Sequence, residues 1–332
     1  MLGVLRRGYR VIDTYLLGAL MGRTTTASFW YIPEPPAVYD AETLDRYEDY
    51  RAHGVVSPVY PIDHRQKTAY DLTNSDGIIV LKYPEPVGEQ INPEAAFQFA
   101  LGLHDRFIAG EGDALRDQFL HYAAYFRDRQ TEQGDFNYEF DWAGWKAPWT
   151  SALAQSRGVS VMLRAYLLTQ DETFAVAARR GLSKFSVQIS DGGYLGISNE
   201  TGCPYFEEYP PRPSAVINGF MAAAIAPWEV ARWLGDEKAA ELAAMAKQSI
   251  EKMLPHYTTS WWTLYDHNPE TPFPNYHSPR YQIMCVGYLK ALSRMFRSEE
   301  IARHAAIWEK QLTPLNKARA TVLKFVRKAV YE

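Results

Sequence analysis

The chain has 332 residues, of which 47% are hydrophobic and 22% charged, the proportions of a soluble globular protein with a sizeable core. Its net charge of −4 excludes a global attraction to nucleic acid, so a polyanionic partner has to be met by a local cluster of cations. Cys203 and Cys285 lie far apart without CxxC spacing, which argues against a zinc ribbon or a disulfide framework and fits a reducing, cytoplasmic compartment.

The N-terminal stretch has the outline of a secretory leader without its defining details. Three arginines precede an apolar run at 11–21, but Asp13 and Thr14 interrupt this run and no small-residue cleavage site follows it. We therefore expect the stretch to be retained. No stretch of the sequence reaches the ~20 consecutive apolar residues of a membrane span.

Residues 22–90 are rich in proline, tyrosine and glycine. Short apolar runs at 28–32 and 77–81 are bounded by turn formers, a pattern typical of short strands joined by loops. The strongest turn signal is Asn74-Ser75-Asp76-Gly77, because Asp followed by Gly supplies the positive φ angles of a tight hairpin turn. We assign residues 1–90 to an N-terminal segment of short strands and loops.

From residue 93 onward, apolar residues recur every three to four positions, which predicts amphipathic helices. These helices are expected at 94–108, 113–131, 151–169, 172–188, 215–234, 236–253, 277–296 and 299–311. Antiparallel helix pairs joined by short loops, with aromatic strands at 134–145 and 261–266 between pairs, are typical of an (α/α) toroid. The sequence thus predicts a mainly α fold with the toroid over residues 91–313. A plain helical bundle or solenoid is the alternative.

Residues 314–332 form a separate basic segment. Lys317, Arg319, Lys324, Arg327 and Lys328 alternate with apolar residues at helical spacing. A basic amphipathic helix can lie on an anionic membrane surface, although a terminal helix docked on its own domain is commoner. Both interpretations stay open, so the expected cytoplasmic location includes a possible contact with a membrane surface.

The segment 205–214 presents ionisable groups on a stiff loop. Glu207, Glu208 and Tyr209 precede three closely spaced prolines, and Ser214 is placed to cap the helix expected after it. A solvated acidic loop is the simplest interpretation of this segment alone.

The chain is rich in aromatic residues, with 22 Tyr and 9 Trp. These residues either fill an aromatic-rich core or indicate sugar binding, because aromatic faces with phenolic tips suit stacking and hydrogen bonding.

Three motifs follow one another along the chain. The first runs from Gly144 to Thr169 and contains Ser151-Ala152-Leu153-Ala154-Gln155. The second is Glu207-Glu208-Tyr209-Pro210 with 216–221, and the third is Tyr265-Asp266 followed by Asn275-Tyr276-His277. In this order they resemble the W-x-SA-x-AQ…RAYLLT, EEYP…VLNGF and YD…YH motifs of the D-glucuronyl C5-epimerase family. The resemblance covers about residues 90–312 and is specific because three separate motifs agree.

The resemblance implies an enzyme that inverts C5 of glucuronate within a polysaccharide and gives iduronate. A proton α to a carboxylate is a very weak acid, so the carboxylate must be neutralised while one group removes the C5 proton and another returns one from the opposite face. The resemblance implies that Glu208, Tyr209, Tyr265 and Tyr276 surround the sugar, with Tyr276 opposed to either Glu208 or Tyr209. A tyrosine base needs nearby positive charge or hydrogen bonds, because its free pKa is about 10.

The other candidates are side chains that would bind the substrate: Gln155, Arg157, Arg164, Glu207, Asn218, Asn275, His277 and Arg280. The cations among them are suited to holding a carboxylate or stabilising a phenolate. Structural alternatives stay open for each: Tyr265 as an interior aromatic, Arg164 as the partner of an acidic side chain, and Asn218 as a helix-start residue with a local hydrogen bond.

The chain also departs from the family's pattern. Tyr265-Asp266 is followed by His267-Asn268 where the family has an arginine, and Arg280 stands where it has a second histidine. The chemistry at C5 can therefore be kept while the neighbouring sugars differ from those of heparosan.

Three functions remain in competition, all with a glucuronate-containing polysaccharide as partner. The first is a polysaccharide glucuronyl C5-epimerase. The second is a polysaccharide lyase, in which loss of the same proton is followed by loss of the C4 substituent, and the third is a non-catalytic glycan-binding protein. HExxH, acidic metal loops and Cys/His ligand spacing do not occur in the sequence, so we expect neither metal nor cofactor. The resemblance implies a homodimer, which the sequence itself neither supports nor opposes.

Overall fold

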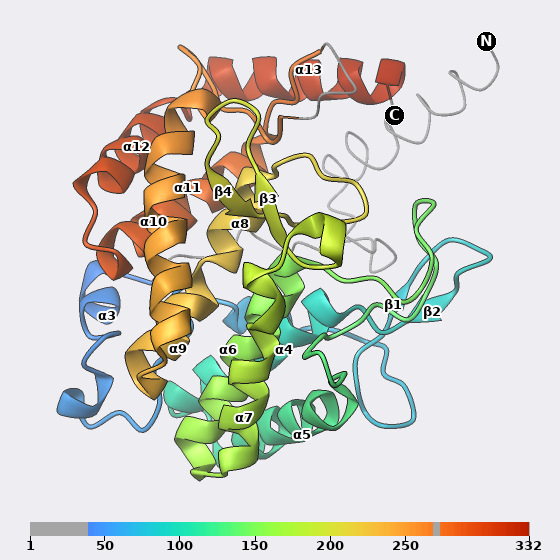
Figure 1. Cartoon of the computed structure of the whole chain (residues 1–332), viewed down its shortest axis with the longest axis vertical. Helices are drawn as coiled ribbons and strands as arrows, with labels where there is room; N and C mark the ends of the chain where they lie inside the picture. The colour runs from blue at the N-terminus through green and yellow to red at the C-terminus, as the bar shows by residue number, and fades with distance from the viewer. Residues whose placement is uncertain (1–38, 268–272, 332) are drawn as a thin grey trace.

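The computed structural model describes residues 39–267 and 273–331 of the chain. Within these ranges the fold is mainly helical and its strands are short (Figure 1). The elements are α3 (Ala41–Asp45), β1 (Leu81–Lys82), β2 (Glu89–Gln90), α4 (Pro93–Ile108), α5 (Asp113–Arg129), α6 (Ala152–Thr169), α7 (Glu172–Gly181), β3 (Leu195–Ile197), β4 (Pro204–Phe206), α8 (Ile217–Ala223), α9 (Ile225–Leu234), α10 (Glu237–Tyr257), α11 (Pro279–Met295), α12 (Glu299–Lys310) and α13 (Pro314–Tyr331).

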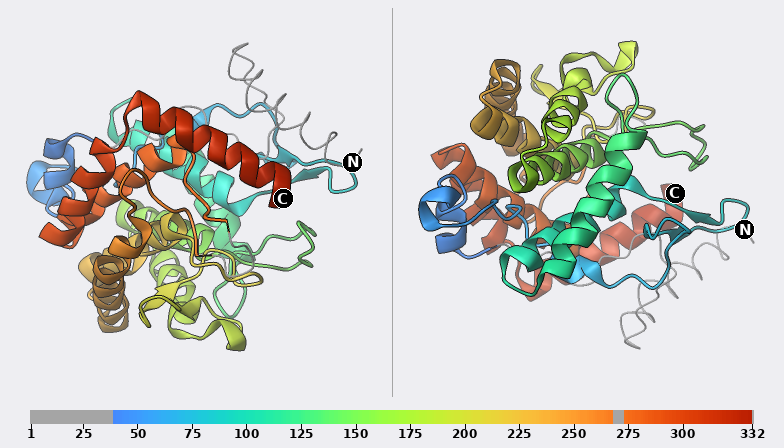
Figure 2. Two further views of the ribbon diagram at one scale, coloured as in Figure 1. Left: turned by 90° about the horizontal axis from the view of Figure 1, so that it is seen from above. Right: turned by 90° about the horizontal axis from the view of Figure 1, so that it is seen from below.

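The helices pack as consecutive pairs around a common centre (Figure 2). Helix α4 pairs with α5, α6 with α7, α9 with α10, and α11 with α12. Helices α4, α6, α8 and α11 lie side by side in this order and form the inner layer, because α6 contacts both α4 and α8, and α8 contacts α11. This arrangement is the (α/α) toroid that the sequence predicts.

Side-chain caps determine where these helices begin. Asn92 accepts a hydrogen bond from the N–H of Ala95 at the start of α4, and Ser151 caps α6 in the same way. Asp236, Ser278 and Ser298 cap α10, α11 and α12. These short polar side chains satisfy N–H groups that have no partner inside the helix. The local sequence therefore marks the start of these five helices before any tertiary contact is considered.

The helix expected at 215–234 is divided in two. Helix α8 ends at Ala223 and α9 begins at Ile225. The division has a simple cause: Pro227 has no N–H with which to bond the carbonyl of Ala223, four residues earlier. The prediction of one continuous helix was therefore wrong.

The N-terminal segment contains the short β pairings that the sequence predicts. Strands β1 and β2 form an antiparallel hairpin, and Thr73 pairs with Ile79 across the expected turn. In that turn Asn74 Oδ1 accepts hydrogen bonds from the N–H groups of Asp76 and Ile78, and Gly77 has a φ of 76°. The turn is confirmed, whereas the strand expected at 28–32 lies outside the described residues.

A buried ion pair joins α6, α9 and the N-terminal segment. The guanidinium of Arg164 lies 2.8 Å from Glu229 Oε1, and both side chains are completely buried. Arg164 also donates hydrogen bonds to the carbonyls of Pro58 and Val59, and Glu229 accepts one from Ser160. A buried pair of this kind depends on both partners, since removal of one leaves an uncompensated charge in the core.

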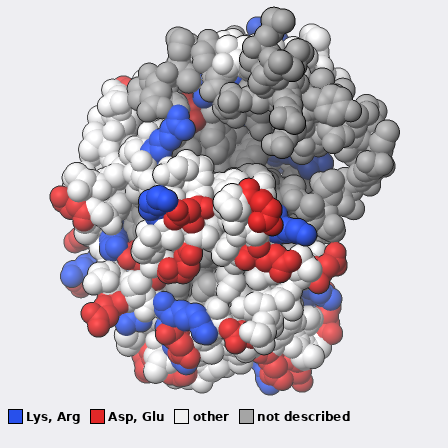
Figure 3. Space-filling view, turned by 90° about the vertical axis from the view of Figure 1, so that its right-hand side faces the viewer, with Lys and Arg blue, Asp and Glu red and all other residues white. Residues whose placement is uncertain are grey.

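Helix α13 docks on the body of the domain. It contacts α11, and Lys324 and Arg327 donate hydrogen bonds to Asn275 and to the carbonyl of Phe273. In the described part of the chain, no helix is both long and apolar enough to cross a membrane. The face drawn in Figure 3 carries acidic and basic side chains interspersed with one another, in keeping with the small net charge.

We predict that Arg164→Ala lowers the free energy of unfolding by about 3 to 5 kcal/mol, because it leaves the Glu229 carboxylate buried without its partner. Chemical denaturation of the purified protein measures this. Arg303→Ala, which removes an exposed partner of Glu300, is the control and is expected to change the same quantity far less, because an exposed ion pair contributes little to stability. Equal losses in the two variants would contradict the prediction.

Candidate active site

The carboxylate of Glu207 organises the loop after β4. It is completely buried and accepts hydrogen bonds from the N–H of Tyr209 at 3.0 Å, from those of Ser214 and Ala215 at 2.9 Å, and from the hydroxyl of Tyr205. Ala215 has a φ of 52° at the close of this loop. Ser214 is therefore not the predicted helix cap, because α8 begins without a side-chain cap. Glu207, expected to bind substrate, instead holds the loop together.

The adjacent Glu208 lies against α8. Only 4% of Glu208 is exposed, and its Oε2 has no hydrogen-bond partner among the described residues. The carboxyl sits on Gly219, where the Cβ of any other residue would overlap both Oε2 and Cβ of Glu208. Native structures rarely leave a buried polar atom without a partner, so this oxygen marks a place for a ligand.

Burial is the main reason that the pKa of Glu208 is raised to about 8. The charges of Glu207 and Asp266 raise this pKa as well, whereas a hydrogen bond from Tyr209 and the charge of Arg157 lower it. A carboxyl group whose pKa lies near neutral pH can both release and accept a proton under physiological conditions. The pKa of Glu208 is thus suited to a general acid or base.

Tyrosines gather around Glu208. Burial, and after it the charge of Glu208, raises the pKa of both Tyr209 and Tyr265 well above the ordinary value, and Tyr281 acts in the same direction on both. The rings of Tyr265 and Tyr281 meet edge to face at 5.5 Å, and the ring of Tyr209 lies 5.3 Å from that of Trp145. Tyr209 and Tyr265 are therefore neutral phenols that can donate a proton.

Tyr276 has a different neighbour. Its ring lies 5.0 Å from the ring of Trp261, and its backbone pairs with Leu264 in the hairpin that also carries Tyr265. In the described contacts, Tyr281 rather than Tyr276 accompanies Tyr265. Glu208, Tyr209 and Tyr265, three of the four residues that the resemblance implies, influence one another electrostatically, and Tyr281 is a further phenol beside them. Their catalytic roles stay a prediction.

His277 supports this hairpin from inside the domain. Its side chain is completely buried, with Nδ1 2.9 Å from Thr263 Oγ1 and Nε2 3.4 Å from Cys285 Sγ. Burial lowers the pKa of His277 to about 3, and the charge of Lys324 contributes to the shift. A neutral, buried imidazole cannot attract a carboxylate by charge, so its contacts fit a supporting role better than the substrate-binding role expected for it.

Two further candidates make structural contacts. Gln155 donates to the carbonyls of Gly134 and Gly181 and accepts from the N–H of Phe136. Helix α7 ends at Gly181 and a 3₁₀ turn follows at Ser183–Ser186, so the prediction of one helix up to 188 was wrong. Arg164 is engaged by Glu229, which is the structural alternative that the sequence left open.

The remaining candidates have different surroundings. Arg157 is buried, paired with Glu94 and hydrogen-bonded to the hydroxyl of Tyr288, and its charge lowers the pKa of Glu208. Asn218, next to Gly219, has a buried Oδ1 without a hydrogen-bond partner. Asn275 donates to Asp266 Oδ2 at 2.8 Å and accepts from Lys324, whereas Arg280 is exposed at the start of α11.

Sequence reasoning missed the contributions of α11 and α13. Tyr281, Cys285 and Tyr288 are spaced four and three residues apart, so they lie on one face of α11. That spacing was a usable signal, since their charges act on Glu208 or its neighbouring tyrosines. Lys324 gave no such signal, because only the folded chain brings α13 to Tyr265, where Lys324 Nζ lies 4.9 Å from the ring centroid.

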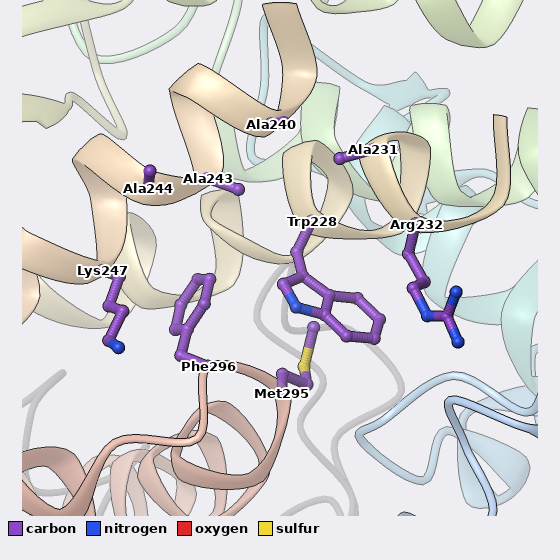
Figure 4. A pocket seen from close by; sticks show the side chains of 9 residues that line it. All are labelled: Trp228, Ala231, Arg232, Ala240, Ala243, Ala244, Lys247, Met295 and Phe296. Atoms are coloured by element: carbon purple, nitrogen blue, oxygen red, sulfur yellow. The ribbon is translucent and has the colours of Figure 1, made fainter. Parts of the chain in front are cut away.

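A groove on another face does not involve these residues. It lies between α9, α10 and the end of α11, where Trp228, Met295 and Phe296 form its apolar wall and Arg232 and Lys247 its edge (Figure 4).

Among residues 39–267 and 273–331, no three His, Cys, Asp or Glu side chains are grouped so that they could hold a metal ion.

Comparison with known protein families gives a direct result. Residues 129–310 match the family described as D-glucuronyl C5-epimerase C-terminus. The chain belongs to this family. The matched segment contains Glu208, Tyr209, Tyr265, Tyr276 and Tyr281, whereas α13 lies beyond it.

The chain is also similar to two known proteins over part of its length. It is 31% identical over 175 residues to the D-glucuronyl C5-epimerase of Caenorhabditis elegans, a match that covers 48% of this chain and 28% of that protein. It is 30% identical over 134 residues to an uncharacterized protein of Methanocaldococcus jannaschii, covering 40% of this chain and 44% of the other. The match thus spans less than half the length of either relative.

Two solved structures align with part of this chain. The unsaturated glucuronyl hydrolase of a Bacillus species, described as responsible for glycosaminoglycan degradation, aligns with a TM-score of 0.46 and 14% identity, over 69% of this chain and 60% of that one. A family 76 glycoside hydrolase, a mannosidase of Bacteroides thetaiotaomicron, aligns with a TM-score of 0.44 and 14% identity, over 69% and 61%.

We predict that Gly219→Ala displaces the Glu208 carboxyl, because the added Cβ overlaps it. Misplacing a catalytic group by about 1 Å can lower a rate about a hundredfold, so the variant is expected to lose at least about tenfold of any activity that depends on Glu208. Gly54→Ala is the control, since Gly54 has a φ of 72° and open space around it. It is expected to lose stability through backbone strain while it keeps activity. Unchanged activity in a folded Gly219→Ala protein would contradict the assignment.

Proposed function

We propose that this member of the D-glucuronyl C5-epimerase family converts D-glucuronate to L-iduronate residues within a polysaccharide, without a cofactor. The observation that carries the proposal is Glu208, a buried carboxyl with one unpartnered oxygen and a pKa raised to about 8. Family membership supports an epimerase-type activity and a polysaccharide substrate. The polymer itself is left open by the departures at His267 and Arg280.

In the proposed reaction, ionised Glu208 removes the C5 proton of the glucuronate. The electron pair of the C5–H bond moves toward the C6 carboxylate, which gains negative charge and needs a nearby cation. Tyr265, a neutral phenol beside Glu208, returns a proton to C5 from the opposite face. In the reverse direction the two groups exchange roles, and Tyr265 then removes the proton.

The ionisation of Glu208 gives the forward reaction a pH dependence. Glu208 must be deprotonated to act as the base, and its pKa is raised to about 8. The rate at which glucuronate loses its C5 proton therefore rises with pH up to about 8 and then levels off, as long as the fold persists.

The experiment that tests the proposed function is incubation of the wild-type protein with glucuronate-containing polysaccharides, heparosan included, in deuterated water, followed by NMR. We expect the uronate H5 signal to disappear while iduronate resonances appear. Formation of an unsaturated end group would show a lyase instead. Glycan binding without deuterium at C5 would show a binding protein, and either result would overturn the proposal.

Two matched Tyr→Phe variants test which phenol opposes Glu208. We predict that Tyr265→Phe lowers H5 exchange at least about a hundredfold, because the variant retains the ring and loses only the proton donor. Tyr276→Phe, the variant that the family motif would favour, is expected to have the smaller effect because Tyr276 packs on Trp261. The reverse order of the two effects would assign the proton donor to Tyr276 and contradict our assignment of Tyr265.

A further inference from the structure

The hairpin before α6 carries a tryptophan to the candidate active site. At its tip, Trp142 and Trp145 exchange backbone hydrogen bonds of 3.1 and 2.8 Å. Ala143 and Gly144 between them have φ angles of 52° and 89°, the positive values that a two-residue hairpin turn requires. Residues paired in this way place their side chains on the same face of a hairpin. Trp142 and Trp145 therefore share one face, and the ring of Trp142 lies 5.0 Å from that of Tyr83, directly after β1 (Figure 1).

The ring of Trp145 joins this hairpin to the loop of Glu208. It lies 5.0 Å from the ring of Trp149 and 5.3 Å from the ring of Tyr209, the residue that follows Glu208. Trp149 meets it edge to face and is buried, whereas Trp145 and Tyr209 are both partly exposed. Trp145 and Tyr209 thus form an aromatic surface that begins beside Glu208 and reaches solvent.

The indole N–H of Trp145 is available to a ligand. Three other tryptophans donate this group to acceptors within the protein: Trp149 to the carbonyl of Phe140, Trp262 to the carbonyl of His277, and Trp308 to Thr258. Within the part of the chain that the structure describes, the indole N–H of Trp145 has no such acceptor, and it is not among the buried atoms. It is therefore directed to solvent next to Tyr209.

A partly exposed indole with a spare N–H suits a sugar. The C–H face of a sugar ring stacks on the aromatic face, while a sugar hydroxyl accepts the hydrogen bond. The hairpin tip adds no net charge, because Lys146 beside Trp145 is paired with Asp141. The surface therefore favours an uncharged sugar over a second uronate. The proposed reaction acts on a uronate within a polymer, so the sugars on either side of the reacting one need surfaces next to Glu208 on which to lie.

We propose that Trp145 stacks on the uncharged sugar next to the reacting uronate and so holds the polymer across the site. This inference rests on the proposed epimerase function. It extends the site from the reacting uronate, which lies at Glu208 and Tyr265, to a neighbouring sugar held by the hairpin before α6. Trp145 is a substrate-binding residue in this arrangement and takes no part in the proton transfers.

The test uses the full-length chain and an octasaccharide of heparosan, or of the uronate polymer that the wild-type protein exchanges. H5 exchange in deuterated water gives kcat and KM, and calorimetry gives the affinity. Trp145→Leu removes the aromatic face and the N–H but keeps an apolar side chain against Trp149. Trp145→Phe keeps an aromatic face and loses the N–H. Trp228→Leu is the matched control, because Trp228 is a partly exposed tryptophan of the groove on another face.

We expect Trp145→Leu to raise both KM and the dissociation constant about tenfold, because a tryptophan at the centre of a contact often carries a large share of the binding energy. Its kcat is expected to stay within about twofold of the wild-type value, since Trp145 contacts a sugar that does not react. Trp145→Phe is expected to raise KM by a smaller factor of about three, because it loses the hydrogen bond alone. Trp228→Leu is expected to behave as the wild type.

A purely structural role for Trp145 predicts a different result. Trp145 would then only support Tyr209, whose hydrogen bond lowers the pKa of Glu208. Trp145→Leu would lower kcat, leave the affinity unchanged, and raise the midpoint of an NMR titration of the Glu208 carboxyl. That result, or a KM and an affinity equal to those of the wild type, would show the inference to be wrong while leaving the proposed function intact. A wild-type protein that exchanges H5 in neither heparosan nor any other uronate polymer would overturn the proposed function, and this inference with it.

Discussion

The arrangement of the site depends on one buried carboxylate. Glu207 accepts three backbone N–H groups and the hydroxyl of Tyr205, and so closes the loop between β4 and α8. These hydrogen bonds explain how a carboxylate can be buried there, since a buried charge is tolerated only when its acceptors are satisfied. The loop in turn places the side chain of Glu208 against Gly219, which has no Cβ to displace it. Glu207 therefore positions the residue that we propose to act on the substrate.

Burial raises the pKa of both neighbouring glutamates, but their hydrogen bonding differs. Glu207 has a complete set of hydrogen bonds, whereas Glu208 keeps one oxygen without a partner and has a pKa raised to about 8. Such an arrangement costs stability, because a buried carboxyl gains favourable energy only when something binds it. Tyr209 and Tyr265 are kept neutral by the same low-polarity surroundings. Glu208 is thus surrounded by phenols that stay protonated, next to a carboxyl oxygen that a ligand can reach.

Much of the fold could be predicted from the sequence, because helical spacing and capping residues such as Asn92 and Ser151 are local features. The order of the three motifs likewise indicated the loop of Glu208 and the hairpin of Tyr265. Partners that are distant in sequence could not be predicted. Glu229 follows Arg164 by 65 residues and gave no sign that the two would pair. The capping role of Ser214 failed because Glu207 holds the N–H groups of Ser214 and Ala215 in the loop, and α8 begins only at Ile217. The contact of Lys324 with Tyr265 depends on how α13 docks. The amphipathic pattern of α13 alone predicts that its apolar side chains face the domain and that its cations face solvent.

Burial raises the pKa of Glu208 toward neutral pH, where it can exchange a proton with the substrate, so its ionisation is the most direct test. The side-chain carboxyl carbons of glutamate can be labelled with ¹³C and followed by NMR titration, with Glu208→Gln used to assign the signal. We predict a midpoint near pH 8, raised from the ordinary value by burial. A midpoint near the ordinary glutamate value of about 4.3 would mean that burial does not tune this carboxyl toward neutral pH, and would contradict its role as a general acid and base.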